Sequence, residues 1–362
     1  MRTFMTFLLG LAALCGAWPI AAQEAAGTIK SLRGQTTLER AGVRRPAKVG
    51  EALQEKDRLR TGEDGQASVA LRDQSLLAIG PRADVDLSRF RFAPTTHQGE
   101  QQVRVRSGSL AAISGKIAKA SPEAVQFNAG TVTLGVRGTQ FVMEVQPQGD
   151  GVLHWRDGSG QPLRNAQGLC WQQGTSGLAL HSDCHPDRFV LLPDRDGQVG
   201  RITLTHPSGS LTLSTAHAAA QAGPQTLAPL RLSEAEVRSR YQSLIDSLPP
   251  APKTFVLRFA SGSAQALSAE SLPVLEQIRA AVAGWPVAAD LSVVGHTDTV
   301  GDASSNDALS LERARTVVKL LRDAGVQPAQ WHPAGRGQRE LQVPTPANTP
   351  EALNRRVEVT LY

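Results

Sequence analysis

The chain has 362 residues and a formal net charge of +5, and aromatic residues make up only 4% of it. Its length suits two or three domains, because a typical domain has about 100–200 residues. No apolar stretch, the N-terminal run included, reaches the roughly 20 residues that a membrane-spanning helix needs, so we expect no such helix.

The first residues of the chain predict a secretory signal peptide at residues 1–22. Arg2 supplies a short positive segment, the apolar run covers Phe4–Ala17, and cleavage is expected after Ala22. Cys15 follows a leucine, whereas a lipoprotein signal requires a small residue before the cysteine, so we expect no lipid anchor. The mature protein is expected in the periplasm, associated with the cell wall or the outer membrane. Its positive charge then points to wall polymers or lipid head groups and not to nucleic acid.

Residues 25–222 predict an all-β region. Apolar and polar residues alternate as in strands at Thr28–Leu32, Ala67–Leu71 and Gln102–Arg106, and glycine turns such as Ser107-Gly108 separate these runs. Many short strands of this kind favour a sandwich, a roll or a solenoid-like stack. We divide the region into an all-β domain at 25–148 and a β extension at 149–222. The extension either belongs to the same unit or forms a small separate one.

Two cysteines remain after removal of the signal peptide, Cys170 and Cys184. An even pair in an oxidising compartment favours a disulfide between them. The alternative is a metal site that adds His181 and His185 to the cysteines. That spacing matches no structural zinc pattern, in which a ligand pair stands at each end. We therefore predict the disulfide and no metal.

Residues 223–253 are predicted to be a linker with one short helix. The stretch Ala216–Pro229 is rich in Ala, Gln, Gly and Pro, which is a linker composition. Ser233 is then expected as the N-cap of a helix with one apolar face. Leu248–Pro252 ends this helix, because prolines do not continue it.

Residues 254–362 alternate between strands and helices. The expected elements are strands at Phe255–Phe259 and Leu291–Val294, helices at Ser268–Val282 and Asn306–Ala324, and two further strands near Trp331–Gly335 and at Arg356–Leu361. This β-α-β-α-β-β order predicts an α+β domain in which one sheet carries two helices on one face. The protein as a whole is thus predicted to be multidomain.

The second of these helices carries charges on two sides. At about 100° per residue, Glu312, Arg315 and Lys319 form a solvent-facing stripe, whereas Arg313 and Asn306 fall on the apolar side near the helix N-terminus. A buried arginine needs a partner. It either pairs internally or extends to the rim of the apolar surface, or it belongs to a ligand clamp, and the helix geometry alone leaves both alternatives open.

The position of Asp298 favours the clamp. It lies in the loop Gly295–Gly301, at the C-terminal end of a strand expected to be central, and ligands of open α/β sheets bind outside such strand ends. A carboxylate that faces Arg313 there makes a pocket with both signs of charge. This pocket suits a zwitterion whose amino group contacts Asp298 and whose carboxylate makes a bidentate contact with Arg313.

Three motifs occur in this part of the chain: Gly295-His296-Thr297-Asp298, then Leu309–Ala314 with Asn306 shortly before it, then Asn354–Glu358. In spacing and order they resemble the OmpA-like peptidoglycan-binding domain that also occurs in peptidoglycan-associated lipoproteins. The resemblance runs from about residue 254 to the C-terminus.

This resemblance implies a peptidoglycan site without a cofactor. Asp298 and Arg313 would grasp the zwitterionic end of meso-diaminopimelate in the stem peptide, and Asn306 would be the loop asparagine of the family. The resemblance also gives secondary roles to four residues: Thr297 and Gly301 shape the loop, and Arg355 or Arg356 closes the site.

A second set of motifs lies in the β region, at Val49–Leu53, Asp57–Thr61, Gly65–Val69 and Gly135–Phe141. They resemble a FecR domain over about residues 27–145. In iron-regulatory FecR proteins this domain is the periplasmic sensing part, joined to a membrane helix and a cytoplasmic anti-sigma segment. We find no counterpart of either segment and do not carry the signalling role over. Arg137 is best explained by stabilising its own glycine turn, so no site is predicted in this half.

An enzyme is not predicted, because no catalytic triad, Cys-His pair, glutamate pair or metal dyad stands out, and we name no catalytic residue. We expect a non-catalytic envelope protein that binds peptidoglycan through diaminopimelate, while the FecR-like domain presents a second binding surface. The alternative is a periplasmic sensor or adaptor in which the FecR-like domain recognises a protein or glycan partner and the OmpA-like domain only anchors it.

Overall fold

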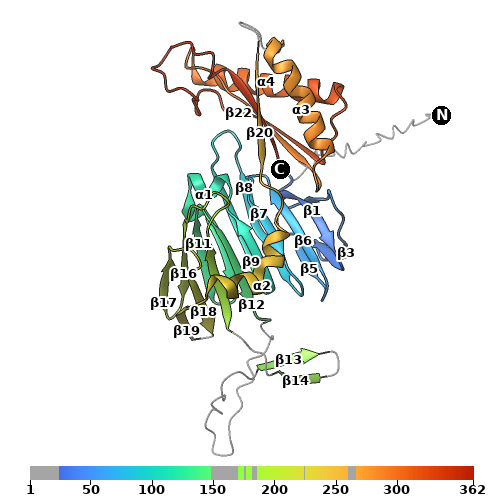
Figure 1. The fold of residues 1–362 in the computed structure, drawn as a ribbon, viewed down its shortest axis with the longest axis vertical. Helices are drawn as coiled ribbons and strands as arrows, with labels where there is room; N and C mark the ends of the chain where they lie inside the picture. The colour runs from blue at the N-terminus through green and yellow to red at the C-terminus, as the bar shows by residue number, and fades with distance from the viewer. Residues whose placement is uncertain (1–23, 148–169, 175–176, 182–185, 224, 260–265) are drawn as a thin grey trace, which may run out of the picture.

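The computed structural model describes residues 24–147, 170–174, 177–181, 186–223, 225–259 and 266–362. For the hairpin of β13 (Cys170–Gly174) and β14 (Gly177–His181) only the backbone is described. The predicted signal peptide and Cys184 of the predicted disulfide lie outside the described residues. The described chain forms a large β unit and a smaller α+β module, stacked along the long axis of the molecule (Figure 1).

The β unit consists of two sheets that share one long strand, β9 (Gly99–Ile113). Sheet A is antiparallel throughout and has the order β4 (Ala52–Leu53), β1 (Gly27–Arg33), β6 (Gln66–Leu71), β7 (Leu76–Ile79), β9, β12 (Gln140–Val145), β15 (Asp187–Leu192), β18 (Ala219–Gly223) and β19 (Thr226–Leu230). Sheet B has the order β3 (Val43–Pro46), β2 (Thr36–Arg40), β5 (Arg58–Thr61), β8 (Asp84–Phe92), β9, β10 (Val125–Ala129), β11 (Val132–Arg137), β16 (Arg201–His206) and β17 (Gly209–Leu213), with only β9–β10 parallel. Between β9 and β10 lie the short helix α1 (Lys116–Ala120) and the turn η1 (Pro122–Ala124).

Strand β9 passes from one sheet to the other at Gly108. Its first part pairs with β8 and β10 in sheet B, and its last part pairs with β7 and β12 in sheet A. Gly108 has a φ of +82°, and a Cβ there would lie 2.4 Å from the Cα of Ala83. Only glycine adopts this conformation without strain. The turn signal Ser107-Gly108 therefore marks a bend within one strand and not a break between two.

The inward side chains of the two sheets form one continuous hydrophobic core. Phe127 of sheet B and Phe141 of sheet A meet edge to face across it, with ring centroids 4.9 Å apart, which is a geometry that aromatic pairs prefer. Both rings are almost fully buried, and each contributes about 1.5–3 kcal/mol through burial. The predicted all-β region is thus a pair of stacked sheets that enclose one hydrophobic core.

Residues 187–230 continue these two sheets and form no separate unit, since β15 pairs with β12 and β16 pairs with β11. The predicted linker at 216–229 is wrong, because β18 and β19 form a hairpin there at the edge of sheet A. The buried side chains of this hairpin are small, as at Ala219, Ala220 and Ala222. Small residues pack closely but lack the alternation of large apolar residues that identifies a strand in a sequence.

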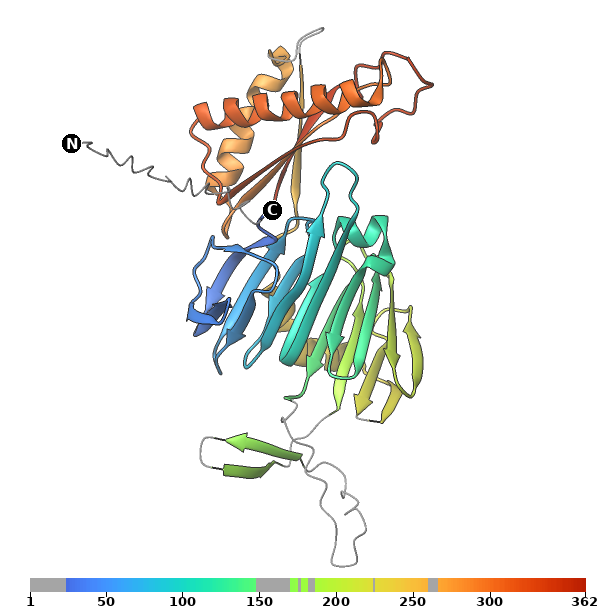
Figure 2. The same ribbon diagram turned by 180° about the vertical axis from the view of Figure 1, so that it is seen from behind.

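Helix α2 (Glu234–Asp246) packs on the outer surface of sheet A (Figures 1 and 2). Ser233 caps it as predicted, and its backbone N–H donates in return to the Glu236 carboxylate at 2.7 Å. Val237 and Tyr241 share a core with sheet A, and the Tyr241 hydroxyl donates to Glu144 Oε2 at 2.9 Å. The segment that leads to the C-terminal module is therefore docked on the β unit.

The C-terminal module is one four-stranded sheet with two helices. Its elements are β20 (Lys253–Arg258), η2 (Ala269–Ser271), α3 (Leu272–Ala283), β21 (Asp290–Gly295), α4 (Ala303–Asp323), β22 (Gln330–Gly335) and β23 (Arg356–Leu361). The strand order is β20-β23-β21-β22, with β21 and β22 parallel and the other pairs antiparallel. Leu257, Val293 and Val359, on one face of the sheet, share a core with Ile278 of α3 and Val317 of α4. Both helices therefore cover the same face.

A buried polar cluster joins the β unit to the C-terminal module. Lys30 of β1 is 0% exposed, and its Nζ pairs with Asp290 Oδ2 at 3.1 Å and donates to the backbone oxygen of Tyr362 at 2.8 Å. Burial lowers the pKa of Lys30 to about 8, against the opposing effect of Asp290. Arg336 adds a second link, because its Nη1 donates to the carbonyl of Pro94 at 2.9 Å. The two units are thus connected by directional contacts as well as by the chain.

Candidate functional site

Helix α4 approaches the sheet closely because glycines face it. A Cβ at Gly295, the last residue of β21, would lie 1.9 Å from the carbonyl oxygen of Ser310, and a Cβ at Gly335 of β22 would lie 2.6 Å from the backbone nitrogen of Leu311. The Ser310 hydroxyl also accepts a hydrogen bond from the Gly337 N–H at 2.9 Å. This packing brings the first half of α4 next to the loop that leaves β21.

Asp298 lies in that loop and is 7% exposed. Its Oδ1 accepts from the Val300 N–H at 3.3 Å, and its Oδ2 accepts from the Glu351 N–H at 3.3 Å and from Arg355 Nη1 at 2.7 Å. These three donors fix the orientation of the carboxylate. Its position at the C-terminal end of a central strand agrees with the prediction.

Arg313 is 6% exposed, as the helical wheel predicted for the apolar side of α4. Its Nη1 donates to the carbonyl of His296 at 3.5 Å, its Nε has no hydrogen-bond partner, and its Cζ lies 5.7 Å from the centre of the Phe259 ring. Burial lowers the pKa of Arg313, the neighbouring Arg355 lowers it further, and Asp298 acts in the opposite direction. Within the described residues this buried guanidinium has no carboxylate at ion-pair distance, so Asp298 and Arg313 are neighbours without a direct bond.

Asn306 ties the loop to α4. Its Nδ2 donates to the carbonyl of Val300 and to Gln338 Oε1, both at 3.0 Å. The Thr297 N–H donates to the carbonyl of Gly337 at 2.9 Å, and Gly301 turns the chain with a φ of +84°. These contacts hold the loop in shape, and the resemblance to the OmpA-like family implies a role of this kind for Thr297 and Gly301.

The two candidate arginines of the third motif, Arg355 and Arg356, contact different partners. Arg355 is 31% exposed in its side chain and pairs with Asp298, so it lies at the mouth of the site. Arg356 is directed elsewhere: its Nε donates to Glu358 at 2.7 Å and its Nη1 to the carbonyl of Glu340 at 3.1 Å. Of the two alternatives, Arg355 or Arg356, the contacts bring Arg355 and not Arg356 to Asp298.

Two contributors were not predicted: Gln338, which holds Asn306, and the backbone N–H of Glu351, which holds Asp298. Both lie between β22 and β23, where no regular element or periodic pattern marks the sequence. The one available signal was topological, because the loop after a strand parallel to β21 emerges at the same edge of the sheet.

Within the described residues, no group of three or more His, Cys, Asp or Glu side chains could hold a metal ion. No helix there is long and apolar enough to cross a membrane. The alternative metal site around Cys184 and His185 lies outside the described residues.

Two parts of the chain match known protein families. Residues 57–155 match the model of the FecR protein family, and residues 258–355 match that of the OmpA family. The chain therefore combines a FecR domain, within the β unit, with an OmpA-family domain that contains the site. Both resemblances noted in the sequence are confirmed. No curated protein matches the chain.

Several solved structures are similar to about 30% of this chain. The peptidoglycan-associated lipoprotein from Burkholderia pseudomallei is 23% identical and covers 30% of this chain and 89% of its own, with a TM-score of 0.27. The cell wall anchor of the T6SS from Pseudomonas aeruginosa is 30% identical and covers 31% of this chain and 81% of its own, with a TM-score of 0.25. The periplasmic domain of Helicobacter pylori MotB is 22% identical and covers 30% of this chain and 75% of its own, with a TM-score of 0.26.

Proposed function

We propose that the OmpA-family domain binds peptidoglycan non-covalently through the free zwitterionic end of meso-diaminopimelate in the stem peptide. The ligand carboxylate takes the guanidinium of Arg313, and the ligand ammonium takes the carboxylate of Asp298. Asn306, Thr297 and Gly301 hold the loop between them, and Arg355 orients Asp298 at the entrance.

The observation that carries this proposal is the state of Arg313. Burying a cation without a carboxylate at ion-pair distance costs free energy, so this site has room for an anionic partner. A ligand carboxylate supplies two hydrogen bonds in the planar geometry that a guanidinium favours. Asp298, held in the neighbouring loop, is then the only acid needed for the ligand ammonium.

The wider role follows from this binding. We infer a non-catalytic protein of the cell envelope, resident in the periplasm and attached to the wall by its C-terminal module. The FecR domain then presents a second binding surface, for a protein or a glycan. The junction at Lys30 supports this arrangement, because its buried contacts join the β unit to the C-terminal module.

The test is co-sedimentation of the full-length mature protein with purified sacculi. Asp298→Ala and Arg313→Ala should each weaken binding by about 2–5 kcal/mol, since each leaves the opposite ligand charge unpaired. The double variant should lose less than the sum of the two, because both residues act on one ligand group.

Arg315→Ala is the matched control, because Arg315 lies on the exposed side of the same helix. It should pellet with sacculi as the wild type does. If the Asp298 and Arg313 variants are folded by circular dichroism and still pellet like Arg315→Ala, the diaminopimelate clamp is wrong.

A further inference from the structure

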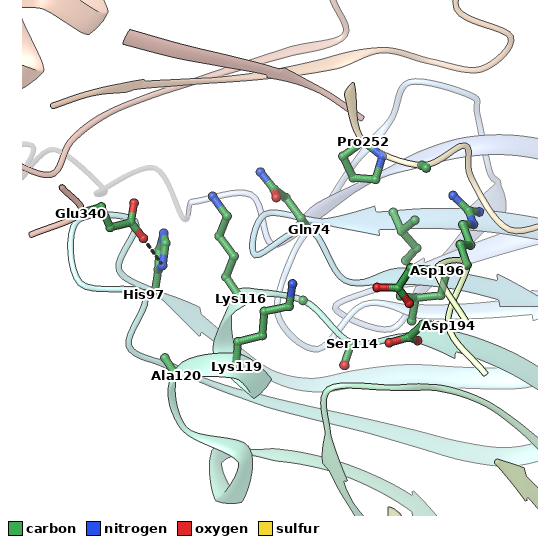
Figure 3. Close-up of a pocket in the computed structure, with 15 residues that line it drawn as sticks. Gln74, His97, Ser114, Lys116, Lys119, Ala120, Asp194, Asp196, Pro252 and Glu340 are labelled. Carbon is green, nitrogen blue, oxygen red and sulfur yellow. Dashed lines mark ion pairs between the residues drawn. The ribbon is translucent and has the colours of Figure 1, made fainter. Parts of the chain in front are cut away.

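The hairpin of β8 and β9 projects from the β unit toward the C-terminal module (Figures 1 and 2). Its tip, Pro94–His97, lies within the segment that matches the FecR family. The carbonyl of Pro94 accepts a hydrogen bond from Arg336 Nη1 at 2.9 Å. The Nδ1 atom of His97 lies 3.5 Å from Glu340 Oε1 (Figure 3). Both ends of the tip therefore contact one loop of the C-terminal module.

Arg336 is the main contact between the tip and this loop. Its side chain is 6% exposed, and its Nε pairs with Glu340 Oε2 at 2.8 Å while its Nη1 donates to Pro94. One acceptor of this buried guanidinium thus belongs to its own loop and another to the β unit. A buried donor that loses its acceptor destabilises the arrangement that holds it. The conformation of Arg336 therefore depends on the tip.

The tip itself has a defined shape. His97 has a φ of +60°, which is uncommon for a residue other than glycine, and its ring lies nearly parallel to that of Phe92, with centroids 6.0 Å apart. Burial lowers the pKa of His97 to about 3, and Lys116 and Arg336 add to this effect. The imidazole is therefore neutral at pH 7, and its contact with Glu340 is polar and not ionic.

The loop that receives the tip also holds the Asp298 site. The described residues Arg336–Glu340 belong to no helix or strand, so their shape depends on their contacts. The carbonyl of Gly337 accepts from the Thr297 N–H at 2.9 Å, and Gln338 Oε1 accepts from Asn306 Nδ2 at 3.0 Å. The same loop therefore contacts the β unit on one side and the site on the other.

We propose that the tip Pro94–His97 is a positioning element for the Asp298 site. It fixes Arg336, and the loop that follows Arg336 then holds Thr297 and Asn306 in place. The FecR-containing β unit thereby strengthens the binding of the wall without contacting the ligand. This inference rests on the proposed binding of peptidoglycan, although the effect of the tip on the loop can be measured without any ligand.

The test shortens the tip in the full-length mature protein. In Pro94–His97→Asn-Gly the tip is replaced by a two-residue turn that suits a hairpin, and strands β8 and β9 are unchanged. The amide protons of Thr297 and Gly337 should then exchange with deuterium about threefold faster, because the loop opens locally more often. The amide of Val293, in the central strand β21, should exchange as in the wild type. NMR measures these rates.

A matched control and a second variant accompany this change. Pro207-Ser208→Asn-Gly alters the turn between β16 and β17 in the same way and should leave the exchange of Thr297 and Gly337 unchanged. His97→Gly removes the contact with Glu340 and keeps the backbone shape, since glycine adopts a positive φ without strain. It should produce a smaller change in the same direction, and it decides the question if the shortened hairpin does not fold.

Co-sedimentation with purified sacculi completes the test. Pro94–His97→Asn-Gly should bind about three- to tenfold more weakly than the wild type, and the control should bind normally. The inference is overturned if neither tip variant speeds the exchange of Thr297 and Gly337. It is also overturned if Arg313→Ala loses binding while the tip variants bind like the wild type, and the proposed function then stands. A wild type that does not pellet with sacculi refutes the proposed function and this inference together.

Discussion

Two regions of the molecule each bury a cation, but only one of them supplies it with a carboxylate partner. At the junction, Lys30 is enclosed by Asp290 and the backbone oxygen of Tyr362. At the loop of the C-terminal module, Arg313 is nearly as buried, but it has a carbonyl at 3.5 Å and no acid in ion-pair contact among the described residues.

This difference separates a structural charge from a ligand-binding one. A cation whose partners come from its own chain stabilises the fold only as long as every partner is present. A cation left without a partner lowers the stability of the free protein, and this loss is offset when a ligand carboxylate pairs with the cation. Lys30 should therefore matter for folding, and Arg313 for binding.

The largest expected effect is at the junction. Lys30→Met leaves Asp290 buried without its ammonium, so the free energy of unfolding should fall by about 3–5 kcal/mol. Lys30→Met combined with Asp290→Leu should recover most of this loss, because neither charge is then left alone. Urea unfolding of the full chain measures both. If the double variant is no more stable than Lys30→Met, the pair is not the origin of the effect.

The next effect tests whether binding needs the guanidinium of Arg313 or only its charge. Arg313→Lys keeps the charge but loses the planar fork, so sacculus binding should weaken by about 2 kcal/mol, the order of a charged hydrogen bond. A titration of sacculi against the fluorescently labelled full-length protein gives this number. Wild-type affinity in Arg313→Lys would show that charge alone suffices.

A third effect concerns pH at the base of the same loop. Burial, together with Arg356 and Arg336, lowers the pKa of His296 to about 3, whereas in the unfolded chain it is about 6.5. Between these pH values His296 is protonated in the unfolded chain and neutral in the folded one. The free energy of unfolding therefore falls as the pH drops from 6.5 toward 3.

His296→Phe removes this titration while filling a similar volume. The melting temperature of the wild type relative to His296→Phe should therefore decline on going from pH 7 to pH 5. A difference that stays constant between these two pH values would mean that His296 does not stay neutral in the folded state.

The smallest effect contrasts most directly with Lys30. Arg313→Met removes a buried charge that has no acid partner. The free energy of unfolding should therefore change by no more than about 0.5 kcal/mol, or rise. Sacculus binding should nevertheless be lost. A drop in stability as large as that of Lys30→Met would make Arg313 a structural residue.

Much of the C-terminal site could be predicted because its signals are local. The wheel of α4 placed Arg313 and Asn306 on the buried side, and the strand end placed Asp298 at the edge where ligands bind. The choice between Arg355 and Arg356 depended on which side of the chain each faces at the start of β23, which sequence spacing alone does not fix.

The junction could not be predicted, because its contacts join residues far apart in the chain. Lys30 stands in an alternating strand, where a lysine is normally expected to face water. Its partners, Asp290 and Tyr362, are more than 250 positions away. The hairpin of β18 and β19 was missed for another reason, since its buried alanines give no periodic signal.

The most direct test of the central claim changes the ligand and leaves the protein intact. Acetylation of the free diaminopimelate amines in purified sacculi removes the ammonium that Asp298 should bind and preserves the carboxylate for Arg313. The full-length protein should pellet with untreated sacculi and stay largely in the supernatant with acetylated ones, and added free meso-diaminopimelate should release it from untreated sacculi. Equal pelleting with both preparations would contradict the proposal that the site recognises a zwitterion.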